Sequence, residues 1–232
     1  MTIEHHKIKF SFNKAIEALK QETKDYSCYK RELKLYENIL KSFDGLTYTT
    51  EVEDTKTAQF FNMEFGEISE TSKLYYIMVW NVQKALEIIK QKNILPTSYE
   101  VEGYRDSLRN VQINPIYAKY HNPAPIIIAK GPHKEDVIID GNHRTYYAIK
   151  NNIKTIPAYV LTMEDSLECI HTDELRAIFK IHKNLMEIAY RIVGDNKKTL
   201  SFSEQFEDGK LFPLHSKAIS KWWSSVLLFL EI

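Results

Sequence analysis

The chain of 232 residues holds 31 lysine and arginine residues against 31 aspartate and glutamate residues, with seven glycines and seven prolines. This composition is ordinary for a globular protein and excludes a disordered or fibrous chain. The charges balance in every part: 14 basic against 15 acidic in residues 1–100, 8 against 7 in 101–165, and 9 against 9 in 166–232. Because non-specific nucleic-acid binders usually carry a basic excess, the balance disfavours nucleic acid as a partner.

Apolar residues recur at helical spacing in three early segments, and these predict helices over residues 12–19, Cys28–Phe43 and Ser72–Asn93. Between them, Leu46–Val52 is rich in β-branched residues and predicts a strand, whereas residues 58–69 fit neither period. Residues 1–93 are therefore expected to form a mainly helical N-terminal extension.

The pattern changes from residue 94 onward, where short continuous apolar runs typical of buried strands appear. In chain order it predicts a short helix Gly103–Arg109, strands Ile126–Lys130 and Val137–Asp140, a helix His143–Asn152 and a strand Thr155–Leu161. The polar turn between the first two strands indicates a hairpin. Residues 94–162 are expected to be a compact α/β unit.

Helix returns in residues 163–232, which we expect to pack on the α/β unit. Thr162 is the predicted N-cap of a helix over Met163–Ile170, followed by a long amphipathic helix Asp173–Val193 and a terminal helix Ser216–Leu230. The predicted fold class is α+β, with a small α/β unit embedded in N- and C-terminal helical additions.

Two further features bear on where the protein works. Cys28 and Cys169 form neither a disulfide framework nor a clustered metal site. The first ten residues lack the apolar core of a signal peptide, and the apolar run Val226–Leu230 is far shorter than the roughly 18–20 residues of a membrane-spanning helix. We expect a cytoplasmic protein without membrane association.

One motif carries chemistry: Asp140-Gly141-Asn142-His143-Arg144, where a predicted strand gives way to a helix. A helix N-terminus offers N–H groups and the positive end of the helix dipole to an anion. Gly141 allows close backbone approach, His143 and Arg144 add donors for phosphate oxygens, and Asp140 can hold a metal ion or orient a neighbour. Spacing alone is a weak signal, because Asp-Gly is a common turn and His-Arg pairs often make ordinary surface contacts.

The order of elements around this motif resembles the ParB/sulfiredoxin-like superfamily over residues 103–162. The similarity covers the short helix, the two strands, the turn, the helix through Ala148 and the closing strand Thr155–Val160. It implies the α/β fold of that superfamily and a nucleotide whose phosphates are bound at the turn.

Two branches of the superfamily fit the turn poorly. Sulfiredoxins have a catalytic cysteine where this chain has Asn142, and an amide cannot replace a thiolate nucleophile. Partition proteins carry a Gly-Glu-Arg-Arg turn and a later Glu-Asn-x-Gln-Arg segment, which Glu168–Lys180 does not contain. Neither sulfiredoxin chemistry nor a CTP-dependent DNA clamp is expected.

A third branch carries Asp-Gly-x-His-Arg and phosphorylates free serine with a nucleotide and a metal. The resemblance to it implies ATP or ADP as ligand, Mg²⁺ or another divalent metal at Asp140, and phosphoryl transfer to a small-molecule acceptor or nucleotide hydrolysis. It also implies a catalytic glutamate, for which Glu100 and Glu102 are candidates. The predicted nucleotide site has Asp140, His143 and Glu102 as catalytic residues. Its phosphate-binding residues are Gly141, Asn142, His143, Arg144 and Lys130.

Two alternatives stay open. Parts of the superfamily act on DNA, so a nuclease or a partition-like regulator is possible, although the neutral charge disfavours it. The helical flanks outweigh the recognised segment, so the chain can also be a non-catalytic protein that binds a partner through them.

Overall fold

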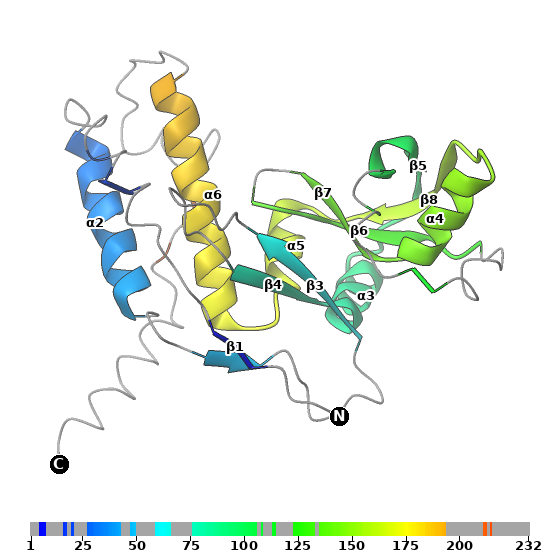
Figure 1. Cartoon of the computed structure of the whole chain (residues 1–232), viewed down its shortest axis with the longest axis horizontal. Coiled ribbons are helices and arrows are strands. Elements are labelled where there is room, and N and C mark those ends of the chain that lie inside the picture. Colours follow the sequence, from blue (N-terminus) through cyan, green and yellow to red (C-terminus); the bar gives the residue numbers. More distant parts are fainter. Residues whose placement is uncertain are drawn as a thin grey trace. The chain divides into compact units, whose positions relative to one another are not determined.

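The structure is a computed structural model of the whole chain (Figure 1). The residues that it describes are 5–7, 16–17, 20, 27–42, 47–49, 59–65, 76–105, 108, 113–114, 123–132, 135–193, 211–212 and 214. They contain both helices and strands, which confirms the α+β class. The chain divides into two compact units, each assembled from separate stretches of sequence.

The first unit comprises described residues within 50–63 and 78–171. Its elements, including those that continue past these bounds, are β3 (Phe60–Phe65), β4 (Tyr76–Asn81), α3 (Val82–Gln91), β5 (Thr97–Glu100), the 3-10 helix η1 (Glu102–Tyr104), β6 (Ile126–Lys130), β7 (Asp136–Asp140), α4 (Asn142–Lys150), β8 (Thr155–Val160) and α5 (Met163–Glu168). The strands form a two-stranded sheet, β3-β4, and a four-stranded sheet with the order β5-β8-β6-β7.

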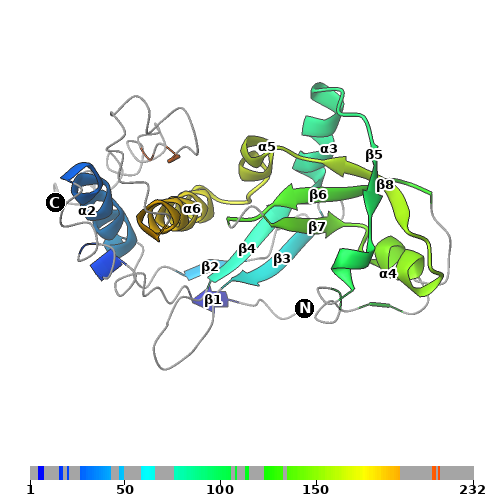
Figure 2. The same ribbon diagram turned by 90° about the horizontal axis from the view of Figure 1, so that it is seen from above.

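The four-stranded sheet carries the candidate site. β6 pairs antiparallel with β7 and parallel with β8, and β5 pairs antiparallel with β8 (Figure 2). The predicted hairpin, the helix after it and the closing strand are therefore confirmed. Continuous apolar sequence suits β6 because Ile126, Ile127 and Ile128 are all buried. Ile126 and Ile128 belong to a core that η1 and α4 cover with Tyr104, Ala148 and Ile149.

β7 contains a bulge just before the motif. Ile128 lies opposite Ile138 and Ile127 lies opposite Asp140, so Ile139 is an additional residue in β7. A bulge bends the strand and changes the direction of the side chain beside it. The strand therefore ends at Asp140 with its regular alternation already broken.

The helix predicted over Ser72–Asn93 is wrong in its first half. Residues Tyr76–Asn81 are the strand β4, and the helix α3 begins only at Val82. The backbone of β4 pairs with the segment after α5: Trp80 bridges Ile170, and the His171 N–H donates to the Val79 carbonyl at 2.9 Å. A short apolar run is equally compatible with a buried strand and a buried helix, so the periodicity of the sequence predicted the wrong element for Tyr76–Asn81.

Three further differences are local. The ambiguous residues 58–69 contain the strand β3, and β5 was not predicted at all. Of the short helix expected at Gly103–Arg109, the structure shows the 3-10 helix η1 and a 3-10 conformation at Leu108, and residues 106, 107 and 109 lie outside the described residues. The helix after Thr162 is confirmed as α5, with Thr162 Oγ1 accepting a hydrogen bond from the Asp165 N–H at 3.1 Å.

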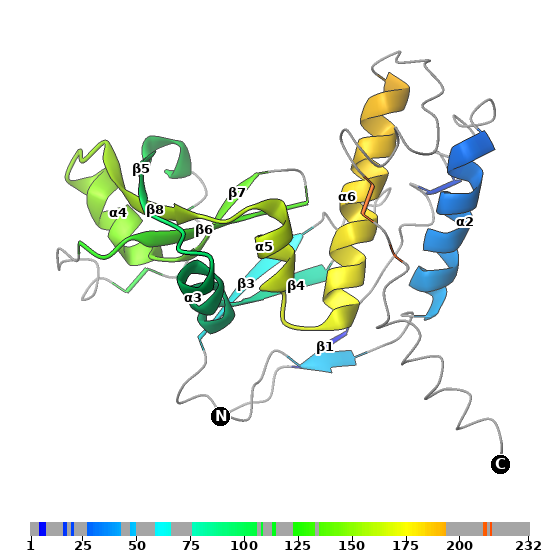
Figure 3. The same cartoon turned by 180° about the vertical axis from the view of Figure 1, so that it is seen from behind.

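α3 and α5 lie side by side in this unit (Figure 3). The Lys92 ammonium, at the C-terminal end of α3, forms an ion pair with the buried carboxylate of Asp165 in α5. Burial alone would raise the pKa of Asp165, but the hydrogen bonds from Lys92 and Thr162 outweigh it and lower that pKa. This carboxylate is therefore ionised at neutral pH and joins the two helices.

The second unit comprises described residues within 2–49, 64–77 and 172–232. It contains the paired strands β1 (His5–Lys7) and β2 (Thr47–Thr49), and the helices α2 (Ser27–Ser42) and α6 (Asp173–Val193), which lie side by side (Figure 1). Both helices were predicted. Buried Asn184 on α6 donates to Tyr36 Oη on α2 at 3.0 Å and exchanges two hydrogen bonds with the backbone of Phe212.

Other expectations for the flanks are only partly covered by the structure. Of the helix predicted over residues 12–19, Ile16 and Glu17 are described and are helical, and the terminal helix Ser216–Leu230 lies outside the described residues. The described part of residues 1–93 contains the strands β1 to β4 in addition to α2 and α3. Among the described helices, none is both long enough and apolar enough to cross a membrane.

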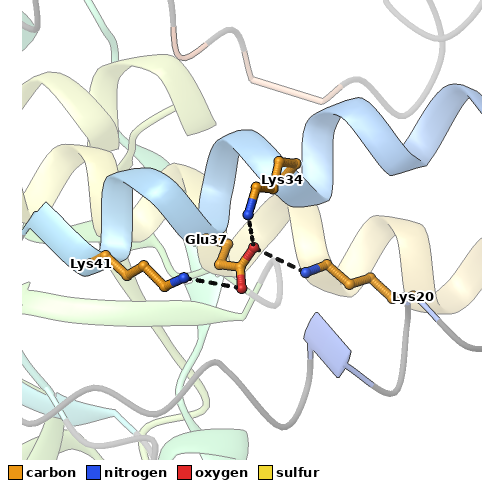
Figure 4. A network of polar contacts seen from close by, with 4 residues as sticks. All are labelled: Lys20, Lys34, Glu37 and Lys41. Carbon is orange, nitrogen blue, oxygen red and sulfur yellow. Dashed lines mark hydrogen bonds and ion pairs between the residues drawn. The ribbon is translucent and has the colours of Figure 1, made fainter.

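A cluster of lysines surrounds one glutamate on α2 (Figure 4). Glu37 accepts hydrogen bonds from Lys34 at 2.9 Å, Lys20 at 3.0 Å and Lys41 at 3.4 Å. The hydrogen bonds from Lys34 and Lys20 lower the pKa of Glu37 to about 2. The cluster carries a net positive charge, but Lys34 and Lys41 are exposed and Lys20 and Glu37 are only half-buried, and ion pairs near the surface contribute little stability.

Candidate functional site

The turn between β7 and α4 requires a glycine. Gly141 has φ +98°, in the left-handed region that other residues avoid, and a Cβ there would lie 2.4 Å from Ile126 Cγ2. The helical hydrogen-bond ladder begins with the Thr145 N–H, which donates to the Gly141 carbonyl at 2.9 Å. Gly141 thus allows the backbone to lie close to β6, and its carbonyl accepts the first helical hydrogen bond of α4.

The N-terminus of α4 has no side-chain cap. By contrast, Asn81 caps α3 by accepting a hydrogen bond from the Lys84 N–H at 2.9 Å, and Thr162 caps α5. The first N–H groups of a helix have no acceptor within the helix, and an anion is well placed to accept from them. α4 therefore offers the kind of N-terminus at which phosphate groups bind.

Arg144 lies over this turn and is held by Asp140. Its Nη2 donates to Asp140 Oδ2 at 2.6 Å, and the two side chains are 17% and 27% exposed. The Nε of Arg144 is buried and has no hydrogen-bond acceptor among the described residues. A charged donor without a partner is costly in a protein interior, so the guanidinium is incompletely satisfied in this arrangement.

His143 and Asn142 are engaged with neighbouring backbone. His143 Nε2 accepts a hydrogen bond from the Asn114 N–H at 3.0 Å, which assigns the ring proton of a neutral imidazole to Nδ1. The Asn142 amide donates to the Ile138 carbonyl at 3.3 Å, across the bulge of β7. The sequence contained no indication of Asn114, because the contact uses its backbone N–H and the residue type does not show which backbone N–H groups form such contacts.

Asp140, Gly141, Asn142, His143 and Arg144 are thus brought together, as predicted. Lys130 is not: it lies opposite Asp136 in the hairpin, whereas Asp140 lies opposite Ile127. Three residues of strand separate the two positions by about 10 Å, and the Lys130 ammonium pairs with Asp136 instead.

Glu102 lies on η1 and is largely exposed. Arg105 Nε donates to Glu102 Oε1 at 2.8 Å, and this hydrogen bond lowers the pKa of Glu102. The carboxylate is therefore ionised at neutral pH, as a general base must be. Among the described residues, Glu102 makes no hydrogen bond or ion pair with the β7–α4 turn.

A divalent metal has one protein ligand available at the turn. Asp140 Oδ2 accepts from Arg144, which leaves Oδ1 for a cation. Mg²⁺ at nucleotide sites is often held by one or two carboxylates together with phosphate oxygens and water, so a single aspartate fits such a site. In the described part of the chain, no group of three or more His, Cys, Asp or Glu side chains is arranged to hold a metal ion.

Comparison with known proteins adds no assignment. No protein-family model, curated protein or solved structure matches this chain. The similarity to the ParB/sulfiredoxin-like superfamily stays a prediction from the sequence, and a function has to be argued from the site itself.

Proposed function

We propose that the β7–α4 turn binds the phosphate groups of a nucleotide, ATP or ADP, and that the protein transfers a phosphoryl group to a small-molecule acceptor or hydrolyses the nucleotide. The observation that carries the proposal is the Arg144 guanidinium, with a buried unpartnered Nε, beside the uncapped N-terminus of α4. The order of elements from β6 to β8, which the superfamily resemblance predicted, supports it.

The chemistry of the turn suits an oxyanion. A phosphate oxygen would accept from the first N–H groups of α4 and would add a second charged acceptor beside Arg144, whose guanidinium is bound by Asp140 at Nη2 and has no described acceptor at Nε. Asp140 fixes one edge of the guanidinium, so fewer rotamers have to be frozen when the anion binds.

Phosphoryl transfer requires positioning and charge neutralisation more than covalent chemistry. When bound, Mg²⁺ supplies positive charge to the phosphates, and Asp140 Oδ1 is the atom that would hold it. His143 and Glu102 are the proposed proton-transfer groups: His143 lies within the turn, and the ionised Glu102 can accept a proton from an acceptor hydroxyl.

The binding step is tested by calorimetry with ATP, ADP and CTP in the presence of Mg²⁺, on the whole chain. Arg144→Ala is expected to weaken the affinity for the bound nucleotide at least about 10-fold, because a charge-assisted hydrogen-bonding group is lost. The Arg144→Lys variant keeps the positive charge but loses the paired N–H donors of the guanidinium. Its affinity for the nucleotide is expected to lie between those of wild type and Arg144→Ala.

Arg176→Ala is the matched control, since Arg176 is a partly exposed arginine on α6 with an i,i+3 aspartate partner of its own. Circular dichroism establishes that each variant is folded. Folded wild-type protein that binds none of the three nucleotides would refute the proposal, as would an Arg144→Ala variant of unchanged affinity. If a nucleotide binds but is neither hydrolysed nor used for phosphoryl transfer, the catalytic part of the proposal is refuted and the binding part stands.

A further inference from the structure

A second polar site lies at the other end of β7. A pocket of about 560 Å³ is lined by Ser98, Tyr99, Glu100, Gly103, Tyr104 and Asp136, from β5, η1 and the first residue of β7. Pockets of this volume accommodate small-molecule ligands. None of its lining residues belongs to the β7–α4 turn.

A chain of hydrogen bonds fixes both phenol protons of this pocket. The Tyr104 hydroxyl donates to Tyr99 Oη at 3.1 Å, and the Tyr99 hydroxyl donates to Asp136 Oδ2. Burial raises the pKa of both tyrosines, and the hydrogen bond from Tyr99 to Asp136 raises that of Tyr99 further. Both phenols are therefore neutral at physiological pH, and each has its single proton committed inside the chain.

Two of the residues that line the pocket, Glu100 and Asp136, carry carboxylates. Lys130 pairs with Asp136 Oδ1, so that these two charges cancel. Glu100 is one of the lining residues, and its exposed carboxylate makes no hydrogen bond or ion pair with another described residue. The groups that remain for a ligand are mainly acceptors: the Glu100 carboxylate, the phenol oxygen of Tyr104 and the hydroxyl of Ser98.

The two tyrosine rings add a surface suited to a cation. Their centroids are 5.9 Å apart and their planes are tilted by 50°, so they form an angled aromatic wall. Aromatic faces attract ammonium groups through the ring quadrupole, and the attraction grows when the cation is partly desolvated. Acceptors, a glutamate without a described partner and two tyrosines at one pocket favour a ligand that is cationic and carries hydrogen-bond donors or methyl groups.

We propose that this pocket binds a small organic ammonium ion, with Glu100 as its counter-charge and the rings of Tyr99 and Tyr104 as its wall. The inference is independent of the nucleotide site, since it uses different residues and a ligand of opposite charge. Asp136 and Lys130 act as positioning residues that hold the Tyr99 hydroxyl in place.

The test is calorimetry on the whole chain with choline and ethanolamine, and with 3,3-dimethylbutanol as the neutral shape analogue of choline. At least one of the two ammonium ions is expected to bind, and the neutral alcohol at least about 5-fold more weakly, since an exposed cation–π contact and a counter-charge are both lost. Glu100→Gln is expected to weaken binding of the ammonium ion about 5- to 10-fold.

Glu87→Gln, which neutralises an exposed carboxylate on α3, is the matched control and is expected to leave binding unchanged. Tyr104→Phe keeps the ring and removes the acceptor oxygen, so a loss of about 2- to 3-fold is expected. The proposal is overturned if neither ammonium ion binds folded protein, if the neutral alcohol binds as well as choline, or if Glu100→Gln has no larger effect than Glu87→Gln.

Discussion

The two ends of β7 carry the same kind of charge pair in opposite settings. At the C-terminal end Asp140 holds Arg144, and at the N-terminal end Asp136 holds Lys130. Around the first pair there is an excess of donors, from the guanidinium and the start of α4. Around the second there is an excess of acceptors, from two phenols and Glu100.

Under the two proposals, an ion pair by itself does not decide which ligand a site takes. In each pair the internal charges cancel, so the surrounding groups determine the sign of the ligand. One aspartate leaves an unsatisfied arginine N–H and favours an anion. The other lies at a pocket that also includes two tyrosines and a glutamate without a partner among the described residues, and we propose a cation there.

The largest expected difference between the two ends concerns their glycines. Gly141→Ala puts a Cβ 2.4 Å from Ile126 Cγ2 at a positive φ, so we expect a loss of about 3 kcal/mol in the free energy of unfolding. Gly103→Ala, in the pocket, meets no atom within 4 Å and is expected to stay within about 0.5 kcal/mol of wild type. Urea denaturation measures both, and equal losses would contradict the close backbone approach at Gly141.

A smaller difference is expected between the two aspartates. Asp140→Asn removes the charged acceptor of a guanidinium that already has one unsatisfied N–H, and we expect a loss of about 2 kcal/mol. Asp136→Asn is expected to cost about 1 kcal/mol, because the partly exposed, flexible Lys130 side chain can turn to solvent and an amide oxygen still accepts from Tyr99. The same denaturation experiment compares them, and a greater loss for Asp136→Asn would reverse the ranking of the two pairs.

The smallest effect is a pH dependence confined to the pocket end. The pKa of Tyr99 is raised above its ordinary value of 10.0 by burial and by the hydrogen bond to Asp136. A phenol whose pKa is higher in the folded state stabilises the fold fully below pH 10.0, and this stabilisation is lost as the pH rises through the folded pKa. Wild type should therefore lose slightly more stability than Tyr99→Phe between about pH 8 and about pH 11, by less than about 1 kcal/mol.

Tyr146→Phe, at an exposed tyrosine on α4, serves as the control for that titration. It is expected to follow the wild-type curve over the same range. The same pH dependence for wild type and Tyr99→Phe would show that the pKa of Tyr99 is not raised in the folded state.

The sequence predicted those parts of the fold that depend on local signals. The β6–β7 hairpin, α4 and the Thr162 cap of α5 follow from apolar runs, turn residues and a capping side chain. β4 was missed because its apolar residues also fit the stripe of the helix that follows, and only its pairing with the segment around Ile170 distinguishes the two. β5 has no apolar run, and its partner β8 lies far along the chain.

The two sites also differ in how far local sequence signals predict them. The motif at the β7–α4 turn consists of five consecutive residues, so its spacing and its glycine could be recognised from the sequence alone. The pocket joins Tyr99 to Asp136, residues 37 apart in sequence, and no local pattern encodes that contact. Lys130 was assigned to the wrong end of the hairpin because the sequence shows that a strand ends there but not which groups lie beside it.

The pairing of β4 with the residues after α5 has a practical consequence for the limits of an autonomous fragment. Residues 94–162 contain the whole motif and would be the natural piece to express alone. Such a piece would lack Trp80, which is fully buried, and the backbone bonds of Val79 and Asn81 to residues 169–171. A fragment that retains these contacts has to run at least from β4 to His171, so truncation within that range is expected to expose apolar surface and promote aggregation.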